Sequence, residues 1–235
     1  MSNTNHQVVS RAQWIEARKQ LLAREKQFTR ERDQLSAARR ALPWVQVTER
    51  YELERPAGKA TLAELFDGKR QLVVYHFMFA PEWQTGCKSC SFWADNFNGI
   101  VEHLAHRDVR LIAVSRAPLA KLTAFANRLG WTFEWVSSHG SSFNHDFGVS
   151  FTPDELAGGK VSYNYETQDA RGSELPGISV FYKDGDAVFH TYSCYARGLD
   201  MMNTAYHYLD LVPKGRDEQG QHPMSWLKLR DEYGA

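Results

Sequence analysis

The chain has 235 residues and no net charge, because 28 lysines and arginines balance 28 aspartates and glutamates. Hydrophobic residues make up 43% and aromatic residues 13%, a composition typical of folded globular proteins that excludes a disordered or fibrous chain. The length favours one elaborated domain over two complete ones. Because there is no basic surplus, we do not expect binding to the phosphates of nucleic acid.

No apolar stretch approaches the roughly 18–20 residues that span a bilayer, so we expect no membrane association. The first residues are polar and no apolar segment follows them, which argues against a secretory signal. Three cysteines are too few for a disulfide framework. We therefore expect a cytoplasmic location, where a cysteine pair serves redox or metal chemistry.

The sequence predicts a long helix over residues 10–42, with Ser10 as N-cap, Gln13 completing a capping box and Pro43 ending the helix. Large apolar residues recur at every seventh position of this segment: Trp14, Leu21, Phe28, Leu35 and Leu42. The companion positions are too polar for a good coiled-coil seam. We expect a surface helix that lies on its own domain or on a partner subunit by one narrow stripe; a coiled-coil homodimer is the alternative.

From residue 45 onwards the pattern changes to strands and helices. Nearly continuous apolar runs at residues 71–79 and 109–114 are typical of strands buried on both faces of a parallel sheet. After each run, apolar residues recur at helical spacing. They predict a helix that extends to Leu104 after the first run and a helix from Leu119 to Leu129 after the second. We also expect short strands within residues 45–53 and 132–136 and a short capped helix that begins at Thr61.

The segment from about 137 to 176 is rich in Gly, Ser and Asn and is predicted to be an irregular insertion, functional or decorative. A hairpin follows over residues 178–192, then an amphipathic helix over 199–209. We divide the chain into a helical extension (1–43), a domain (44–212) and a C-terminal tail (213–235). Alternating strands and helices indicate an α/β fold with a parallel sheet, to which the hairpin adds antiparallel strands.

Cys87 and Cys90 form a C-x-x-C pair where a buried strand gives way to a helix. Unpaired N–H groups at a helix N-terminus favour an anion, so the Cys87 thiol should lose its proton more readily than a free cysteine. Cys90 lies one turn further along and is more shielded, within reach for a disulfide. We predict that Cys87 attacks a substrate disulfide and that Cys90 resolves the mixed disulfide. Trp83 is expected to flank the pair, and Lys88 to add positive potential.

Several segments resemble the thioredoxin-like superfamily, and in particular a bacterial family catalogued as domain of unknown function 899. They are GCKSCSFW at residues 86–93, LIAVSRAP at 111–118, HTYS at 190–193 and YARG at 195–198. The resemblance covers nearly the whole chain, and members of the family are described as dithiol–disulfide oxidoreductases. It implies a thioredoxin-like central sheet with helices on both faces, peroxiredoxin-like additions, and a redox-active pair formed by Cys87 and Cys90.

Two features depart from thioredoxin itself. Thioredoxins place a cis-proline opposite the cysteine pair, immediately before the hairpin strand; Pro176 is the candidate here, one residue earlier than that position. The interior of the C-x-x-C is Lys-Ser rather than Gly-Pro, so the redox potential cannot be transferred from thioredoxin.

The predicted function is thiol–disulfide exchange on an unidentified disulfide substrate, with no organic cofactor and no metal. A reducing partner such as thioredoxin or glutathione would have to reset the dithiol. The long N-terminal helix and the aromatic-rich insertion predict a restricted opening to the site and therefore a small substrate.

A thiol peroxidase is the nearest alternative. Peroxiredoxins show Pro-x-x-x-Thr-x-x-Cys before a helix, whereas Pro81 and Thr85 here precede Cys87 with one residue missing. Arg116, after the second buried strand, would be the cation beside the thiolate, which can react with peroxide when exposed.

Two further alternatives belong to other classes of protein. A zinc site would combine the cysteine pair with His190 and Cys194, which together supply four nitrogen and sulfur ligands. A non-catalytic binding module would instead use aromatic residues of the long insertion, such as those of the FNHDFG segment at 143–148.

Overall fold

The computed structural model describes residues 6–234 and divides the chain into two compact units, the first ending at Pro43 and the second beginning at Trp44. The first unit consists of helix α1 (Arg11–Arg40), of which no residue is buried. Its predicted capping box is confirmed, because the Gln13 N–H donates to the Ser10 hydroxyl while the Ser10 N–H donates to the Gln13 side chain. No helix within residues 6–234 is long and apolar enough to cross a membrane.

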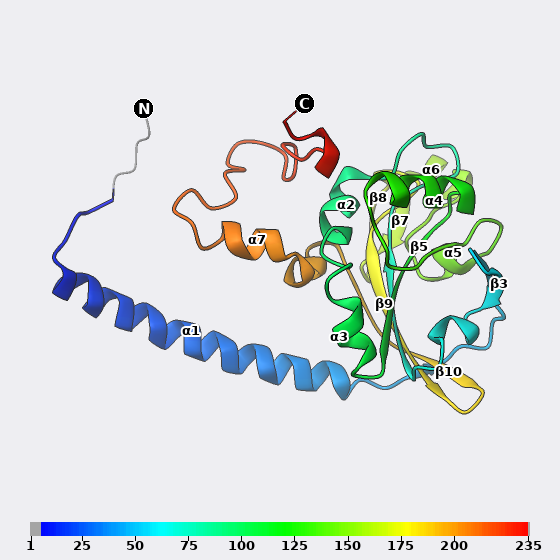
Figure 1. Cartoon of the computed structure of the whole chain (residues 1–235), viewed down its shortest axis with the longest axis horizontal. Coiled ribbons are helices and arrows are strands. Elements are labelled where there is room, and N and C mark those ends of the chain that lie inside the picture. Colours follow the sequence, from blue (N-terminus) through cyan, green and yellow to red (C-terminus); the bar gives the residue numbers. More distant parts are fainter. Residues whose placement is uncertain (1–5, 235) are drawn as a thin grey trace. The chain divides into compact units, whose positions relative to one another are not determined.

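The second unit is built on a sheet of eight strands in the order β1-β10-β9-β4-β5-β6-β2-β3 (Figure 1). Strands β4, β5 and β6 run parallel, and β9 and β10 form an antiparallel hairpin beside β4. The predicted α/β sheet with an added hairpin is therefore confirmed. The strands are β1 (Val45–Gln46), β2 (Glu52–Arg55), β3 (Gly58–Thr61), β4 (Gln71–His76), β5 (Val109–Ser115), β6 (Trp135–Ser137), β9 (Gly177–Asp184) and β10 (Ala187–Tyr195).

Helices cover both faces of this sheet, in the thioredoxin-like arrangement that the resemblance implied. Strand β4 shows why, because Val73 and Tyr75 point into one apolar core while Leu72 and Val74 point into another. The first core is covered by α2 (Lys88–Ala94), α3 (Val101–Ala105), α4 (Leu119–Arg128), the 3-10 helix η2 (Ala196–Met202) and α7 (Thr204–Leu209). The second is covered by the 3-10 helix η1 (Glu64–Phe66) and α5 (Phe143–Asp146).

The helix that was expected to run from the cysteine pair to Leu104 is interrupted. Helix α2 ends at Ala94 and α3 begins at Val101. The Asn96 side chain donates back to the carbonyls of Phe92 and Trp93 at 3.0 and 3.1 Å. Asparagine side chains of this kind compete with backbone hydrogen bonds, which explains why the helical spacing of apolar residues was not sufficient.

The insertion is more regular than its composition indicated. It contains α5, α6 (Pro153–Ala157) and a hairpin of β7 (Lys160–Tyr163) and β8 (Glu166–Asp169), with a small apolar core of its own. Helix α6 begins with a capping box of Thr152 and Glu155, a local signal that the sequence does carry. The insertion therefore acts as a packed subdomain that meets the sheet at Tyr195 of β10.

Candidate active site

Cys87 is the N-cap residue of α2, as predicted, and its backbone is held on both sides. Its N–H donates to the carbonyl of Met78 at 3.1 Å, in the segment that continues from β4. Its carbonyl accepts from the N–H and the hydroxyl of Ser91, both at 3.0 Å. The position of the sulfur is therefore set by the sheet on one side and by the first turn of α2 on the other.

The loop before Cys87 is fixed by α4. The Lys121 ammonium group donates to the carbonyls of Pro81 and Trp83 at 2.7 and 3.0 Å. Gly86 runs so close to the core that a Cβ there would lie 2.9 Å from a ring carbon of Phe77. Only glycine permits this approach, so the loop delivers Cys87 against the aromatic core with little freedom of movement.

The Cys87 thiol is partly exposed, and its pKa is lowered to about 7. The largest cause is the hydrogen bond from the Cys90 side chain; burial opposes it, and the backbone N–H groups of Cys90 and Ser89 and the Ser89 hydroxyl lower the pKa further. Hydrogen bonds to a thiolate favour the charged form. A large fraction of Cys87 is therefore the nucleophilic thiolate at neutral pH.

Cys90 is in the opposite state. Its side chain is buried, and burial, followed by hydrogen bonding and charge from Cys87, raises its pKa well above the ordinary value. The Met78 N–H, at 3.4 Å from the Cys90 sulfur, and the Tyr75 hydroxyl act in the other direction. Because burial also raises the pKa of Tyr75, that hydroxyl remains a hydrogen-bond donor to the sulfur. The pair thus combines an ionised, accessible sulfur with a protonated, buried one.

Cys87 opens into a shallow groove of about 650 Å³, called here the Cys87 groove. The lining comes from the loop before Cys87, from α2, from α4 and from the C-terminal tail. The lining residues are Trp83, Gln84, Thr85, Gly86, Cys87, Lys88, Arg128, Leu229 and Glu232. The structure therefore brings the predicted supporting residues Trp83, Thr85 and Lys88 together around the thiol. The Lys88 ammonium group also donates to the carbonyl of Ser225 in the tail at 3.3 Å.

Arg116 is engaged elsewhere. Its guanidinium group binds one carboxylate oxygen of Glu174, at 2.6 Å through Nε and 2.5 Å through Nη2. Glu174 is buried, and the Ser150 hydroxyl donates to its other oxygen at 2.6 Å. Arg116 is not one of the described residues that line the Cys87 groove. The guanidinium group of Arg116 is thus paired with the buried carboxylate of Glu174 in the insertion.

Pro176 precedes β9, as expected, but the prediction of a cis-proline is wrong. Every peptide bond between residues 6 and 234, including that before Pro176, is trans. The neighbouring insertion holds this segment, because the Tyr163 hydroxyl donates to the Pro176 carbonyl at 2.6 Å and the Leu175 N–H donates to the carbonyl of Val149 at 2.8 Å. The chain then enters the ladder at Gly177, paired with His76 of β4.

The four predicted zinc ligands do not converge. Cys90 and Cys194 lie in the core beneath α2, whereas His190 packs against Phe147 and Phe181 on the other face of the sheet. Across the described part of the chain, no three His, Cys, Asp or Glu side chains are grouped so that they could hold a metal ion.

Sequence reasoning missed Tyr75, Lys121, Arg128 and Leu229. Tyr75 and Lys121 support the cysteine pair and its loop, while Arg128 and Leu229 line the Cys87 groove. The apolar residues around Tyr75 indicated only a buried strand. The roles of Lys121, Arg128 and Leu229 depend on contacts between segments far apart in the chain.

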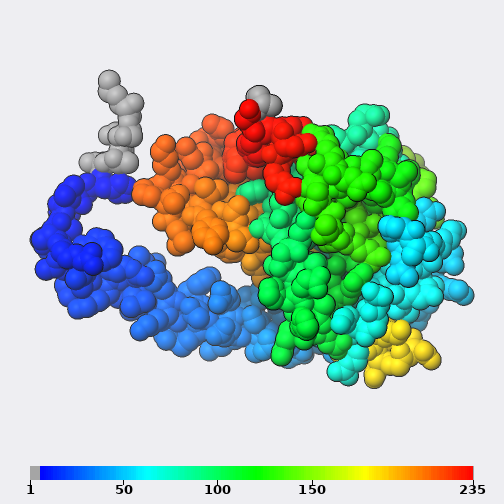
Figure 2. All heavy atoms as spheres, in the orientation of Figure 1, coloured from blue at the N-terminus to red at the C-terminus, as the bar shows by residue number. Residues whose placement is uncertain are grey.

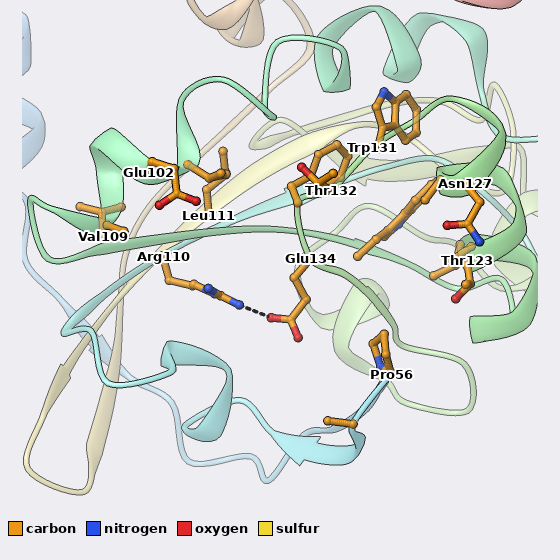
Figure 3. A pocket seen from close by; sticks show the side chains of 17 residues that line it. Pro56, Glu102, Val109, Arg110, Leu111, Thr123, Asn127, Trp131, Thr132 and Glu134 are labelled. Carbon is orange, nitrogen blue, oxygen red and sulfur yellow. Dashed lines mark hydrogen bonds and ion pairs between the residues drawn. The ribbon is translucent and has the colours of Figure 1, made fainter.

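A second hollow, of about 470 Å³, lies between α3, α4, β5 and β6 (Figure 3). Its aromatic side includes Trp131 and Trp135, and Arg110 at its edge pairs with Glu134 at 2.9 Å. None of the described residues that line it is a cysteine, so it is separate from the thiol chemistry.

The pH dependence of Cys87 reactivity tests the electrostatic description. Alkylation of Cys87 by iodoacetamide should rise with pH around a midpoint near 7, and Cys90→Ala should move that midpoint upwards because the strongest lowering effect is lost. The rate is measured by mass spectrometry from about pH 5 to about pH 10. Ser89→Ala is the matched control and should cause a smaller upward movement. A wild-type midpoint at the ordinary thiol value of 9.0 would contradict the description.

Comparisons with known proteins give several similar solved structures and one matching family. No curated protein matches the chain. Similar solved structures include peroxiredoxin Q from Xanthomonas campestris, with 16% identity and a TM-score of 0.46, covering 68% of this chain and 95% of that one. Peroxidoxin BcpB from Mycobacterium tuberculosis has 16% identity and a TM-score of 0.44, covering 68% and 93%. The mitochondrial 2-cys peroxiredoxin from Plasmodium falciparum has 12% identity and a TM-score of 0.40, covering 77% and 96%.

The family comparison covers almost the entire chain, including both cysteines of the pair and the tail that lines the Cys87 groove. Residues 3–233 match the family described as bacterial protein of unknown function (DUF899), and the chain therefore belongs to that family.

Proposed function

We propose that the protein is a thiol–disulfide oxidoreductase that uses Cys87 and Cys90. One observation carries the proposal: Cys87 ionises near neutral pH in an open groove, while its hydrogen-bonded neighbour Cys90 is buried and keeps its proton. A nucleophile must be accessible and ionised to attack, and a resolving thiol must remain unreactive until the mixed disulfide has formed.

The reaction proceeds in two exchanges. The Cys87 thiolate attacks one sulfur of a substrate disulfide, forms a mixed disulfide, and expels the other substrate sulfur as a thiolate that takes a proton from water. Cys90 then loses its proton and attacks the Cys87 sulfur, which releases the second substrate thiol and leaves a disulfide between Cys87 and Cys90. The substrate gains two electrons and two protons, and the protein loses them.

The surroundings of Cys90 favour the second exchange. Its proton must leave a buried site, where the Tyr75 hydroxyl and the Met78 N–H donate hydrogen bonds to the developing thiolate. A dithiol reductant, such as reduced thioredoxin, or two molecules of glutathione would return the two electrons and complete the cycle.

The test is a trap of the mixed disulfide in Cys90→Ser. Serine cannot carry out the second exchange, so a substrate disulfide should remain attached to Cys87 and be identified by its mass. The matched control is Cys87→Ser/Cys90→Ser, which should bind no adduct. Wild-type protein should form no stable adduct but should reduce the same substrate in the presence of a reductant. The absence of any adduct on Cys90→Ser from small and protein disulfides would contradict the proposal.

Reduction of hydroperoxides is the second candidate, because Thr85 lines the same groove as the Cys87 thiolate. Cys87 would attack the peroxide, become a sulfenic acid and release an alcohol or water, and Cys90 would then form the disulfide with loss of water. Cys90→Ser treated with hydrogen peroxide would stop at the sulfenic acid, which dimedone captures. A dimedone adduct without a mixed disulfide would favour this second reaction over the first.

A further inference from the structure

The C-terminal tail forms part of the site although it follows the last helix of the fold. Leu229 and Glu232 line the Cys87 groove together with Trp83 and Thr85, so a substrate that reaches the sulfur meets the tail as well as the loop. Figure 2 shows the red C-terminal segment against the green helices of the same unit. The tail therefore forms part of the wall of the opening.

Several contacts hold the tail to α2. The Lys88 ammonium group donates to the Ser225 carbonyl at 3.3 Å, and the Trp226 ring lies 5.7 Å from that of Phe92 at an angle of 80°. Leu227 and Leu229 are buried, with 2% and 4% of their surface exposed. Buried leucines are a packing contact that a loosely attached terminus does not make.

Ion pairs fasten the tail to α4 and to the end of α2. The Arg128 guanidinium group binds both carboxylate oxygens of Asp231, at 2.6 and 3.0 Å, and one of Glu232 at 3.0 Å. Arg230 donates to the carbonyl of Leu129 and lies 3.5 Å from a carboxylate oxygen of Asp95. Two of these charged residues, Asp231 and Arg230, do not line the groove, so their role is confined to attachment.

We propose that the tail restricts Cys87 to low-molecular-weight disulfides and excludes the disulfides of folded proteins, a specificity that rests on the thiol exchange proposed above. Leu229 and Glu232 of the tail line the same groove as Cys87, and a folded protein would have to displace the tail from both helices to bring its disulfide to the sulfur. A slender disulfide needs no such displacement. Asp231 and Arg230 are thus specificity-determining residues that act through the position of the tail.

The test compares the full-length wild type with Arg230→Ala/Asp231→Ala, called here the release variant, which weakens the attachment of the tail without changing a lining residue. Each protein is alkylated with iodoacetamide and, separately, with a maleimide that carries a long polyethylene glycol chain. We expect the release variant to react with the bulky maleimide about fivefold faster or more, because the tail opens more often. Its rate with iodoacetamide should stay within about twofold of that of the wild type. The milder variant Asp231→Asn should also raise the ratio of the maleimide rate to the iodoacetamide rate.

The matched control is Arg70→Ala, which removes another exposed Arg–Asp pair, that with Asp108, at the opposite end of β4. It should leave both alkylation rates unchanged. An unchanged ratio of bulky to small reagent in the release variants would overturn the proposal.

The redox arm of the experiment uses 2-hydroxyethyl disulfide and insulin. Wild type should reduce the small disulfide much faster than insulin, and the release variant should narrow the difference. Equal rates of the wild type on the two substrates would overturn the proposed specificity. If neither disulfide is reduced while the alkylation ratio still changes, the exchange reaction is wrong, but the control of access by the tail is upheld.

Discussion

Replacing Cys87 by serine is expected to lower the rate of disulfide reduction by about 10³-fold or more, because no other described group supplies the ionised sulfur of the Cys87 groove. A serine hydroxyl stays protonated at neutral pH and does not form a mixed disulfide. The rate is followed as release of substrate thiol with dithiothreitol as reductant. The loss should appear in the rate of turnover at all substrate concentrations, since the first bond cannot form.

Cys194→Ala is the matched control for this substitution, because it removes the third cysteine thiol of the chain from a buried position on β10. It should retain the wild-type rate to within a few-fold, provided that its unfolding transition shows a folded protein. A residual rate in Cys87→Ser similar to that of the wild type would show that the reaction takes place elsewhere.

His76 should make the protein sensitive to acid. Its imidazole is buried on β4, its Nε2 lies 2.9 Å from the Ser179 hydroxyl, and its Nδ1 has no hydrogen-bond partner within residues 6–234. Burial, and secondly the charge of His190, lowers its pKa from 6.5 to about 3. Between these two values the unfolded chain binds a proton that the folded chain excludes, so the free energy of unfolding decreases as the pH falls. The contribution of His76 between pH 7 and pH 5 is about 2 kcal/mol.

The measurement is urea unfolding of wild type and His76→Gln at several pH values. Glutamine does not titrate, so the variant should lose about 2 kcal/mol less than the wild type between pH 7 and pH 5, whatever its stability at pH 7. His103→Gln, which changes an exposed histidine on α3, is the control and should retain the wild-type pH dependence. NMR of wild type provides a second measurement: the His76 imidazole should remain neutral at pH 5. A His76 signal that titrates near 6.5 would refute the assignment.

Local signals in the sequence were sufficient for the elements that local physics decides. Ser10 and Gln13 lie three residues apart and cap the long helix by bonds between neighbours in the chain. The apolar run around Val74 predicted a strand buried on both faces, and the sheet shows it between β5 and β9. Asn96 marks where this reasoning fails, because an apolar spacing does not reveal that an amide will bond to the backbone and end the helix.

The features of the candidate site also fall into those that the sequence predicted and those that only the tertiary structure showed. The amino-acid sequence by itself placed Cys87 at the start of a helix after a buried strand, because hydrophobic runs, helix starts and a C-x-x-C spacing are properties of neighbouring residues. Only the tertiary structure showed Tyr75 behind Cys90, the trans peptide before Pro176, and the tail residue Asp231 bound to Arg128 of α4. These features depend on which distant segments pack together. That packing is decided by burial and by the pairing of charges far apart in the chain, and no local pattern records it.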